Sequence, residues 1–205
     1  MIGIIDTESQ NIGSIVNCLK YLKIEHSLVK NQNQLKKYKK IILPGVGSFD
    51  SVMNALESKN FLTNDFKKEL LKKKVLAICI GMQILFGSSE EGKKKGLNLF
   101  NNNLKIKHLK NIGCKGPIPH VGFNSILLNK KNSKVNKILD KDYYFTHSYG
   151  LDYNKKNLNF DQFGITNYNK STFITFFIYK NIIATQFHPE KSGLAGLKLL
   201  NYFNA

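Results

Sequence analysis

Short apolar runs alternate with amphipathic segments through residues 1–90 of this 205-residue chain. Continuous apolar runs of four or five residues are typical of buried strands, whereas apolar residues spaced three and four apart are typical of helices. Strand patterns lie at 2–6, 26–29, 39–43 and 75–78, and helical patterns lie at 11–22, 52–56, 65–73 and 82–86. Regular alternation of strand and helix favours a mostly parallel sheet covered by helices.

The second half of the chain carries a different pattern, because strand candidates follow one another without intervening helices. They lie at 104–107, 125–128, 143–148, 172–179 and 182–186, and a helical pattern closes the chain at 194–203. We therefore predict an α/β fold with a mostly parallel central sheet flanked by helices and additional antiparallel strands in the second half. The polar stretch 130–142 is expected to be a loop too short to separate domains, so we expect one domain over residues 1–205.

Composition disfavours several functional classes. The formal charge is +17, but all 31 basic residues are lysines and they are scattered along the chain. Arginine is the usual reader of bases and phosphates, so we expect a solvated surface and no nucleic-acid partner. No apolar run is long enough to cross a bilayer, and the first residues lack the features of a signal peptide. We therefore expect a cytoplasmic protein without a membrane partner.

The chain has three cysteines, Cys18, Cys79 and Cys114. An odd number without paired spacing disfavours a disulfide framework. Neither CxxC nor HExxH occurs, so we expect no metal site. Cys18 lies in a helical pattern and is most simply a small buried hydrophobic residue.

The sequence AICIG, residues 77–81, places Cys79 at the end of a strand and the start of a helix. Such a turn lifts the thiol out of the sheet, and the helix N-terminus favours the thiolate. Gly81 lets the chain leave the turn without a side-chain clash. The arrangement is the cysteine version of a nucleophile elbow. The alternative interpretation is a buried core cysteine, which is common in apolar strands.

The segment ATQFHPEKSG, residues 184–193, carries a histidine and an acid two positions apart. In extended backbone His188 and Glu190 point the same way, and Pro189 stiffens the segment. A carboxylate beside an imidazole fixes its tautomer and stabilises the imidazolium, so these two residues and Cys79 would form a catalytic triad. The alternative is an exposed loop histidine with an unrelated ion pair.

The segment PGVGSF, residues 44–49, follows another strand and exposes backbone N–H groups. Such groups bind a phosphate or an oxyanion. The Gly-Lys-Ser/Thr ending of a P-loop is absent. An N–H of Val46 or Gly47 could join that of Ile80 in holding a tetrahedral oxyanion, although a simple tight turn is the alternative. Because function gathers at the carboxyl ends of parallel strands, we expect PGVGSF, AICIG and QFHPEKSG to meet.

Five segments together carry a family resemblance that covers almost the whole chain. In chain order they are ILPGVGSF, AICIGMQILFGSSEEG, PIPHVGFN, YYFTHSYG and QFHPEKSGLAGLKLLNYF. They resemble the glutaminase subunits of imidazole glycerol phosphate synthases, which are class I glutamine amidotransferases with a flavodoxin-like fold. The resemblance implies that Cys79 attacks the side-chain amide of L-glutamine, that His188 is the base and then the acid, and that Glu190 orients His188.

The resemblance also implies a substrate pocket and a partner. The pocket would be lined by Gly47, Gln83, His147, Ser148 and Tyr149. No cofactor is implied, because acyl transfer to a thiol needs none. The products would be glutamate and ammonia, and the ammonia would pass to a (β/α)8-barrel synthase subunit. The residues that would face this subunit are Asn11, Pro119, Val121, Phe123, Tyr144 and Lys191.

The chain departs from the family pattern at three places. Residues 6–11 read DTESQN where a DYGxGN-like loop is usual, Ala77 replaces a glycine, and Phe123 replaces a tryptophan. The altered loop keeps open a glutaminase that supplies ammonia to a surface-sugar amidotransferase. A non-catalytic lysine-rich scaffold or RNA-binding protein is a third hypothesis. A cysteine peptidase ranks last, because THSY and Gln83 belong to a small amino-acid pocket.

Overall fold

The computed structural model describes residues 1–100, 104–130, 134–153 and 159–205. Most strands form one large mixed sheet in the order β2-β1-β3-β4-β13-β12-β10-β6-β5. The strands of the first half are β1 (Ile2–Ile5), β2 (His26–Val29), β3 (Lys40–Leu43) and β4 (Lys74–Ile78). Each pairs in parallel with its neighbours, so the parallel arrangement predicted for the first half is confirmed.

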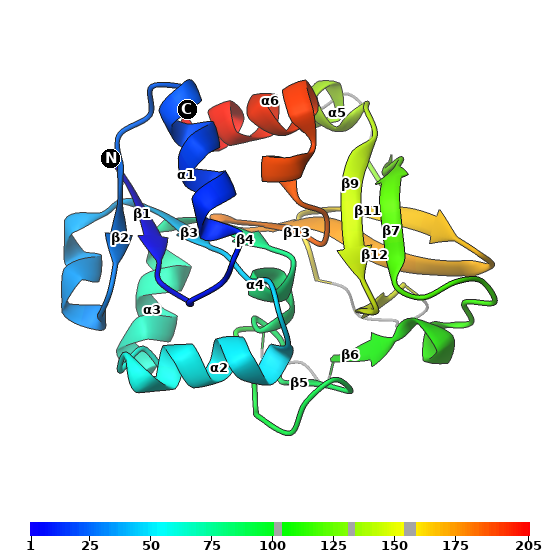
Figure 1. Cartoon of the computed structure of the whole chain (residues 1–205), viewed down its shortest axis with the longest axis horizontal. Coiled ribbons are helices and arrows are strands. Elements are labelled where there is room, and N and C mark those ends of the chain that lie inside the picture. Colours follow the sequence, from blue (N-terminus) through cyan, green and yellow to red (C-terminus); the bar gives the residue numbers. More distant parts are fainter. Residues whose placement is uncertain (101–103, 131–133, 154–158) are drawn as a thin grey trace.

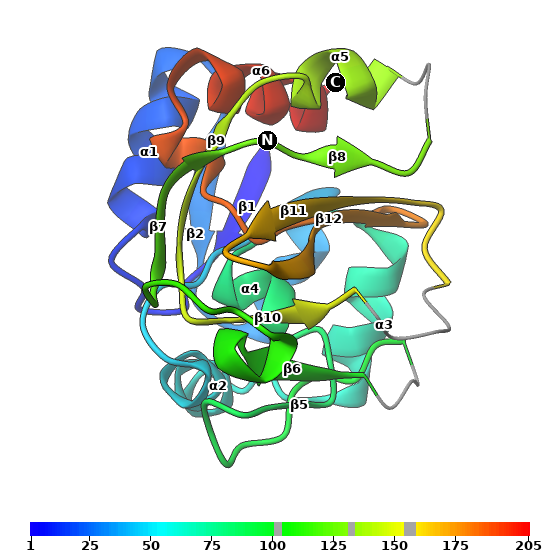
Figure 2. The same ribbon diagram turned by 90° about the vertical axis from the view of Figure 1, so that its right-hand side faces the viewer.

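Helices cover both faces of this sheet (Figures 1 and 2). The helices α1 (Ile12–Tyr21) and α6 (Gly193–Asn204) lie on one side, and α2 (Phe49–Ser58) and α3 (Asn64–Lys72) lie on the other. A short 3-10 helix, η1 (Gln32–Lys37), follows β2. Capping side chains start two helices: Ser48 accepts from the N–H of Ser51 in a capping box, and Thr63 accepts from the N–H of Phe66. Such caps satisfy N–H groups that the helix itself leaves free.

The second half extends the sheet mainly with antiparallel strands. The strand β13 (Ile182–Thr185) pairs in parallel with β4 and antiparallel with β12 (Ser171–Tyr179). The sheet continues with β10 (Tyr149–Asp152), β11 (Gln162–Tyr168), β6 (Lys105–His108), β8 (Leu127–Leu128) and β5 (Ser88–Ser89). The predicted antiparallel additions are confirmed, although β10 and β11 were not expected from the sequence. Buried Ile, Leu, Val and Phe side chains fill both faces of the sheet.

A separate two-stranded sheet stands beside the large one (Figure 1). It consists of β7 (His120–Asn124) and β9 (Tyr143–His147), which pair antiparallel. The sequence patterns did not predict β7 as a strand. Its inward face carries His120 instead of an apolar side chain, while Val121 and Phe123 are exposed. The usual alternation of apolar inward and polar outward residues is therefore missing from the sequence.

Two further expectations about helices need correction. The helix α4 (Ile80–Gln83) begins earlier and ends earlier than the predicted pattern at 82–86. It stops after one turn because the carbonyls of residues 84–86 accept hydrogen bonds from the N–H groups of residues 97–99. The polar stretch 130–142 contains a helix, α5 (Lys134–Leu139), whose Val135 and Leu139 are buried.

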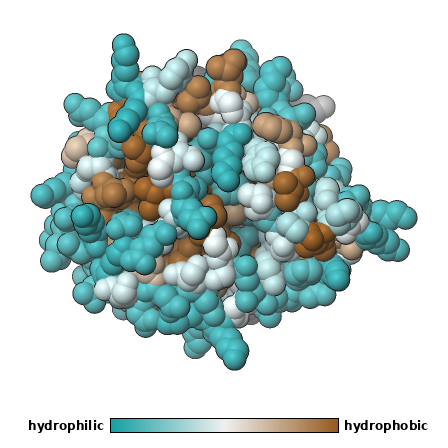
Figure 3. Space-filling model, in the orientation of Figure 1, coloured by the Kyte–Doolittle hydropathy of each residue, from teal (hydrophilic) through white to brown (hydrophobic). Residues whose placement is uncertain are grey.

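The face of the molecule in Figure 3 is mostly hydrophilic, with apolar patches interrupted by polar side chains. Among the described residues, no helix has both the length and the apolar character that crossing a membrane requires.

Candidate active site

The three predicted segments meet at the carboxyl ends of β3, β4 and β13. They line a cavity of about 240 Å³. The residues around it are Val46, Gly47, Cys79, Ile80, Gln83, Glu91, Pro119, Thr146, His147, Ser148, Tyr149 and His188. A cavity with several polar groups at this edge of a parallel sheet is the usual form of a small-molecule site in such folds.

Cys79 occupies a sharp turn between β4 and α4. Its backbone has φ 53° and ψ −110°, a conformation that non-glycine residues rarely adopt and that costs about 1–3 kcal/mol. The turn is held by the N–H of Cys79, which donates to the carbonyl of Thr185 at 2.7 Å. Gly81 is required, since a Cβ there would lie 2.0 Å from the carbonyl oxygen of Leu43. Ala77, which replaces the usual glycine, is accommodated in β4 beside Leu43 and Ala184.

His188 and Glu190 form a buried pair beside Cys79. The distance from His188 Nδ1 to Glu190 Oε1 is 2.8 Å, and both side chains are fully buried. A carboxylate only accepts, so Nδ1 carries the proton and Nε2 is the nitrogen left for the thiol. The segment is not extended as we expected, because Glu190 lies in a short 3-10 helix, η3 (Pro189–Lys191). That turn brings the carboxylate back toward the imidazole.

Charge and burial shift the pKa of His188 in opposite directions. Burial lowers its pKa, but the neighbouring Cys79 and then Glu190 outweigh burial and raise the pKa to about 10. His188 Nε2 makes no hydrogen bond within the described residues. The arrangement therefore favours an imidazolium at neutral pH next to the sulfur, which is the pairing that stabilises a nucleophilic thiolate.

Asn11 belongs to this pair rather than to the surface. Its side chain is 3% exposed, and Asn11 Nδ2 donates to Glu190 Oε1 at 2.8 Å. We expected Asn11 to face a partner, and the structure instead places its side chain against the carboxylate. Within the described part of the chain, four buried side-chain atoms lack a hydrogen-bond partner, and all four belong to this site: Asn11 Oδ1, Gln83 Oε1, His188 Nε2 and Glu190 Oε2. Unused hydrogen-bonding capacity of this kind is typical of sites that bind a ligand.

The predicted oxyanion site is only partly formed. Val46 and Gly47 line the cavity as expected. However, the N–H of Ile80 donates to the carbonyl of Gly45 at 3.3 Å. An N–H that already has an acceptor is not free for an oxyanion, so this bond must open before Ile80 can take the predicted role.

Gln83 and the segment after β9 form one wall of the cavity. Gln83 Nε2 donates to the carbonyl of Tyr149 at 2.9 Å and lies 3.0 Å from Gln186 Oε1. His147 Nδ1 lies 2.8 Å from the same carbonyl. Ser148 also lines the cavity. All the residues expected in the substrate pocket are therefore found together.

His147 is paired with a second buried histidine. His120 Nδ1 lies 3.1 Å from His147 Nε2, and Asn124 Nδ2 lies 3.3 Å from His120 Nε2. Burial lowers the pKa of His120 to about 4. Burial, the charge of His120 and the charge of His188 lower the pKa of His147 to about 3, although its bond to Tyr149 opposes them. Both rings are therefore neutral at physiological pH.

Glu91 is a cavity residue that the sequence analysis missed. Glu91 Oε2 accepts from the N–H of Phe49 at 2.7 Å. Burial raises the pKa of Glu91 despite that bond, and the charge of Asp50 adds to the effect. A carboxylate that lines the cavity suits a cationic group. The sequence feature that could have indicated Glu91 is the acidic pair Glu90–Glu91 in a strongly basic chain.

Four of the residues expected to face a partner lie together at the surface, where Val121, Phe123 and Lys191 are exposed and Tyr144 is half-buried. Val121 is 54% exposed and Phe123 is 61% exposed on β7. The Phe123 ring lies 5.6 Å from the ring of Tyr144, and Lys191 Nζ lies 5.9 Å from the same tyrosine ring. We call Val121, Phe123, Tyr144 and Lys191 the β7–β9 surface. Pro119, also expected at the interface, lines the cavity.

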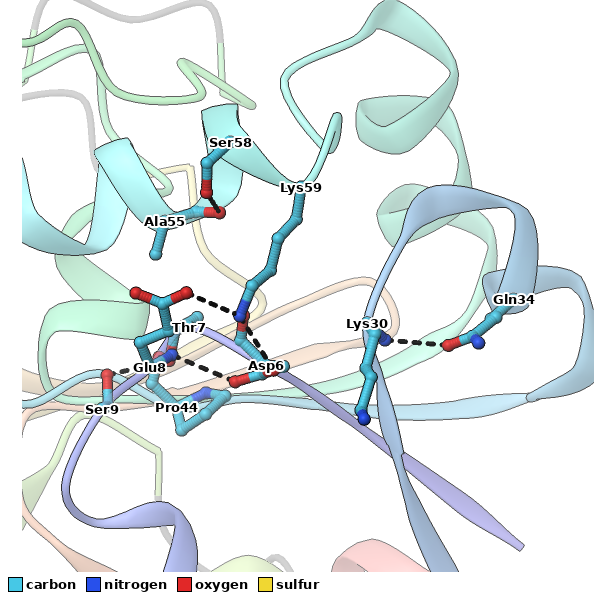
Figure 4. Close-up of polar contacts among 10 residues, drawn as sticks. All are labelled: Asp6, Thr7, Glu8, Ser9, Lys30, Gln34, Pro44, Ala55, Ser58 and Lys59. Atoms are coloured by element: carbon cyan, nitrogen blue, oxygen red, sulfur yellow. Dashed lines mark hydrogen bonds and ion pairs between the residues drawn. The ribbon is translucent and has the colours of Figure 1, made fainter.

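The unusual loop after β1 is held by an ion-pair cluster (Figure 4). Lys59 Nζ lies 2.8 Å from Asp6 Oδ2 and 3.1 Å from Glu8 Oε1. Thr7 Oγ1 lies 2.8 Å from Ser9 Oγ, closing the turn. Glu8 has φ 57°, a left-handed conformation that glycine adopts more readily. The loop therefore keeps a glycine-like shape without glycine.

Comparison with known proteins defines the class. A family model described as glutamine amidotransferase class-I matches residues 3–203. The chain belongs to the class I glutamine amidotransferase family. It is 39% identical over 208 residues to the imidazole glycerol phosphate synthase subunit HisH of Leptospira borgpetersenii, covering 99% of this chain and 98% of that relative.

Two further comparisons extend this result. The chain is 35% identical over 210 residues to the imidazole glycerol phosphate synthase hisHF of Schizosaccharomyces pombe, covering 99% of this chain and 38% of that protein. The solved structure of PurLQS from Thermotoga maritima has a TM-score of 0.72 at 15% identity, covering 99% of this chain and 96% of that one. The predicted family and fold are thus confirmed, whereas the roles of individual residues stay predictions.

Proposed function

We propose that the chain hydrolyses the side-chain amide of L-glutamine to glutamate and ammonia, with Cys79, His188 and Glu190 as the catalytic triad. The observation that carries this proposal is that Cys79 and His188 line one cavity, while Glu190 Oε1 lies 2.8 Å from His188 Nδ1 and Cys79 raises the pKa of His188. Membership in the class I glutamine amidotransferase family supports the same chemistry.

The steps follow from the protonation states. The Cys79 thiolate attacks the amide carbon, a C–S bond forms, and one electron pair moves onto the carbonyl oxygen. When that pair returns, the C–N bond breaks and His188 Nε2 gives its proton to the departing ammonia. Neutral His188 then takes a proton from water, the hydroxide attacks the thioester carbon, and the C–S bond breaks to release glutamate. Glu190 holds His188 in the required tautomer throughout.

The pocket suits the amino-acid end of glutamine. Glu91 offers a carboxylate and Gln83 Oε1 an unpaired acceptor, and both would bind the α-ammonium group. Gly47, His147, Ser148 and Tyr149 would complete the pocket, and their position around one cavity supports this role.

We further propose that the chain is the ammonia-supplying subunit of an imidazole glycerol phosphate synthase in histidine biosynthesis. The name of the Leptospira borgpetersenii relative supports this pathway, and the fused Schizosaccharomyces pombe relative supports a physical association with a synthase. The partner would be a (β/α)8-barrel subunit, bound at the β7–β9 surface. Exposed aromatic and apolar residues next to a cavity suit a protein partner.

The experiment compares glutamate release by the chain alone and by the chain with a candidate barrel subunit and its ligand. Because the N–H of Ile80 is already bonded to Gly45, the chain alone should be slow and the complex much faster. Cys79→Ala should abolish the stimulated activity, and equal activity of this variant would refute the triad. If the barrel gives no stimulation while a surface-sugar amidotransferase does, the loop at 6–11 specifies a different partner and the pathway assignment is wrong.

A further inference from the structure

Gln186 is a buried side chain that directly touches the sulfur of Cys79. It is fully buried and follows β13, two residues before His188. Gln186 Nε2 lies 3.5 Å from Cys79 Sγ, within hydrogen-bonding distance for sulfur. The backbone fixes its place as well, because the N–H of Gln186 donates to the carbonyl of Thr175 at 2.8 Å. A polar side chain this deeply buried needs a reason, since burying an amide is costly unless its groups are bonded.

The amide of Gln186 can be oriented in only one way. The carbonyl of Tyr149 accepts and cannot donate, so the Gln83 atom 2.9 Å from it must be the donating nitrogen. That nitrogen is also 3.0 Å from the side chain of Gln186, so the Gln186 atom facing it must be the accepting oxygen. The nitrogen of Gln186 therefore points at Cys79. Reversing either amide would bring two donors or two acceptors together.

The Tyr149 carbonyl also fixes the tautomers of His147 and His120. His147 Nδ1 donates to the Tyr149 carbonyl, so His147 Nε2 must accept, and His120 Nδ1 must donate to it. His120 Nε2 is left to accept from Asn124 Nδ2. One run of hydrogen bonds thus begins at Asn124 on β7 and anchors Tyr149. From the other side, Gln83 and Gln186 connect Tyr149 to the sulfur.

We propose that Gln186 is a catalytic residue whose side-chain amide donates a hydrogen bond to the Cys79 sulfur and stabilises the thiolate before attack. The catalytic role of Gln186 rests on the proposed glutaminase function, whereas the contact between Gln186 and Cys79 is present whatever the function. No proton is transferred in this role. The amide shares the negative charge of the thiolate, as His188 does from its own side, and it releases the sulfur when the C–S bond forms. A hydrogen bond to a charged atom is stronger than one to a neutral atom, so Gln186 favours the reactive form.

The test measures how fast iodoacetamide alkylates Cys79 at a series of pH values, with mass spectrometry to locate the label. In the Gln186→Met variant, which has similar length but no donor, we expect labelling at neutral pH to slow by about 10- to 100-fold. We also expect the pH midpoint of labelling to rise. Loss of packing alone would change the rate without moving this midpoint. The control is Thr166→Val on β11, which removes an equally buried hydroxyl that donates to the carbonyl of Ser125 at 2.9 Å and does not contact Gln186. It should leave both quantities unchanged.

A second variant keeps the test decisive if Gln186→Met does not fold. Gln186→Asn retains the amide but withdraws it from the sulfur, and it should also slow labelling and raise the midpoint. An unchanged midpoint in the folded variants would overturn the proposal. Labelling needs no glutamine and no partner, so it separates this proposal from the proposed function. Absence of glutamate release by the parent chain in complex with the barrel subunit and its ligand would contradict the function, whereas only the labelling profile bears on Gln186.

Discussion

The backbone N–H of His188 donates to the carbonyl of Tyr144 at 2.9 Å. The proposed base is thereby attached to β9, the strand whose Tyr144 side chain belongs to the β7–β9 surface. Ser192 closes the connection, because its hydroxyl accepts from the N–H of Tyr144 at 3.0 Å and donates to the carbonyl of His188 at 2.6 Å. A partner bound at this surface would act directly on the position of the base.

Ser192→Ala tests this connection. Ser192 is 4% exposed, and its hydroxyl is the acceptor for the N–H of the half-buried Tyr144, so the variant leaves that N–H without this acceptor. We expect a loss of about 1–3 kcal/mol in the free energy of unfolding, together with slower glutamine hydrolysis. Urea denaturation measures the first effect and glutamate release the second. Ser58→Ala, at the end of α2, removes a hydroxyl that donates to the carbonyl of Ala55 and does not line the cavity, so it serves as the control. Equal stability of Ser192→Ala and the parent would contradict the prediction.

Asn11→Ala removes one of the two donors on Glu190 Oε1. The carboxylate then keeps only His188, so its orientation is less constrained. We expect kcat to fall by about 10-fold, the effect of losing one hydrogen bond to a charged group, with little change in KM because Asn11 does not line the cavity. Steady-state kinetics of the complex separates these quantities. A change in KM alone would instead assign Asn11 to substrate binding.

The neutral histidine pair makes stability depend on pH in acid. The pKa values of His120 and His147 in the folded chain, about 4 and about 3, are lower than the ordinary value near 6.5 of an unfolded chain. Below about pH 6.5 the unfolded state binds more protons, so stability falls as the pH is lowered toward about 4. The slope is at most about 1.4 kcal/mol per pH unit for each histidine. Denaturation of the parent and of His120→Gln checks this, and the variant should show a shallower slope. Identical slopes would contradict it.

The raised pKa of His188 makes stability depend on pH in the opposite direction, with the loss at alkaline pH. Its stabilising effect is present below the ordinary pKa of about 6.5 and is lost as the pH rises through about 10. Because Cys79 is the first contributor that raises this pKa, Cys79→Ala should shift the titration of His188 to lower pH. Nuclear magnetic resonance of the labelled ring measures both titrations. The same midpoint in parent and variant would mean that Glu190 alone sets the charge of His188.

The sequence predicted the fold best where the pattern is repetitive. The buried strands and amphipathic helices of the first half are detected by their periodicity, and the elbow at Cys79 follows from a strand pattern that ends before Gly81. By contrast, β7 carries His120 inward and Phe123 outward, which reverses the usual alternation. The early end of α4 depends on bonds between residues 84–86 and 97–99, and pairing of this kind is not encoded in local periodicity.

The candidate site divides in the same way. Cys79, His188 and Gln83 lie in short segments with recognisable spacing. Asn11 and His188 both bond to Glu190 Oε1, although Asn11 is 179 residues from Glu190 in the sequence. The contact between Gln186 and Cys79 spans 107 residues. Neither distance leaves a local signal. The hydrogen bond from the N–H of Ile80 to the carbonyl of Gly45 also joins two separate turns, and no sequence pattern indicates that this predicted oxyanion donor already has an acceptor.

Mapping where a glutamine-analogue electrophile attaches tests the proposed nucleophile most directly. The complex with the barrel subunit is treated with the analogue, digested and examined by mass spectrometry, with and without excess glutamine. We predict a single modification on Cys79 that glutamine prevents, and none in Cys79→Ala. Modification of Cys18 or Cys114 instead, or labelling of Cys79 that glutamine does not slow, would contradict the proposed glutaminase site.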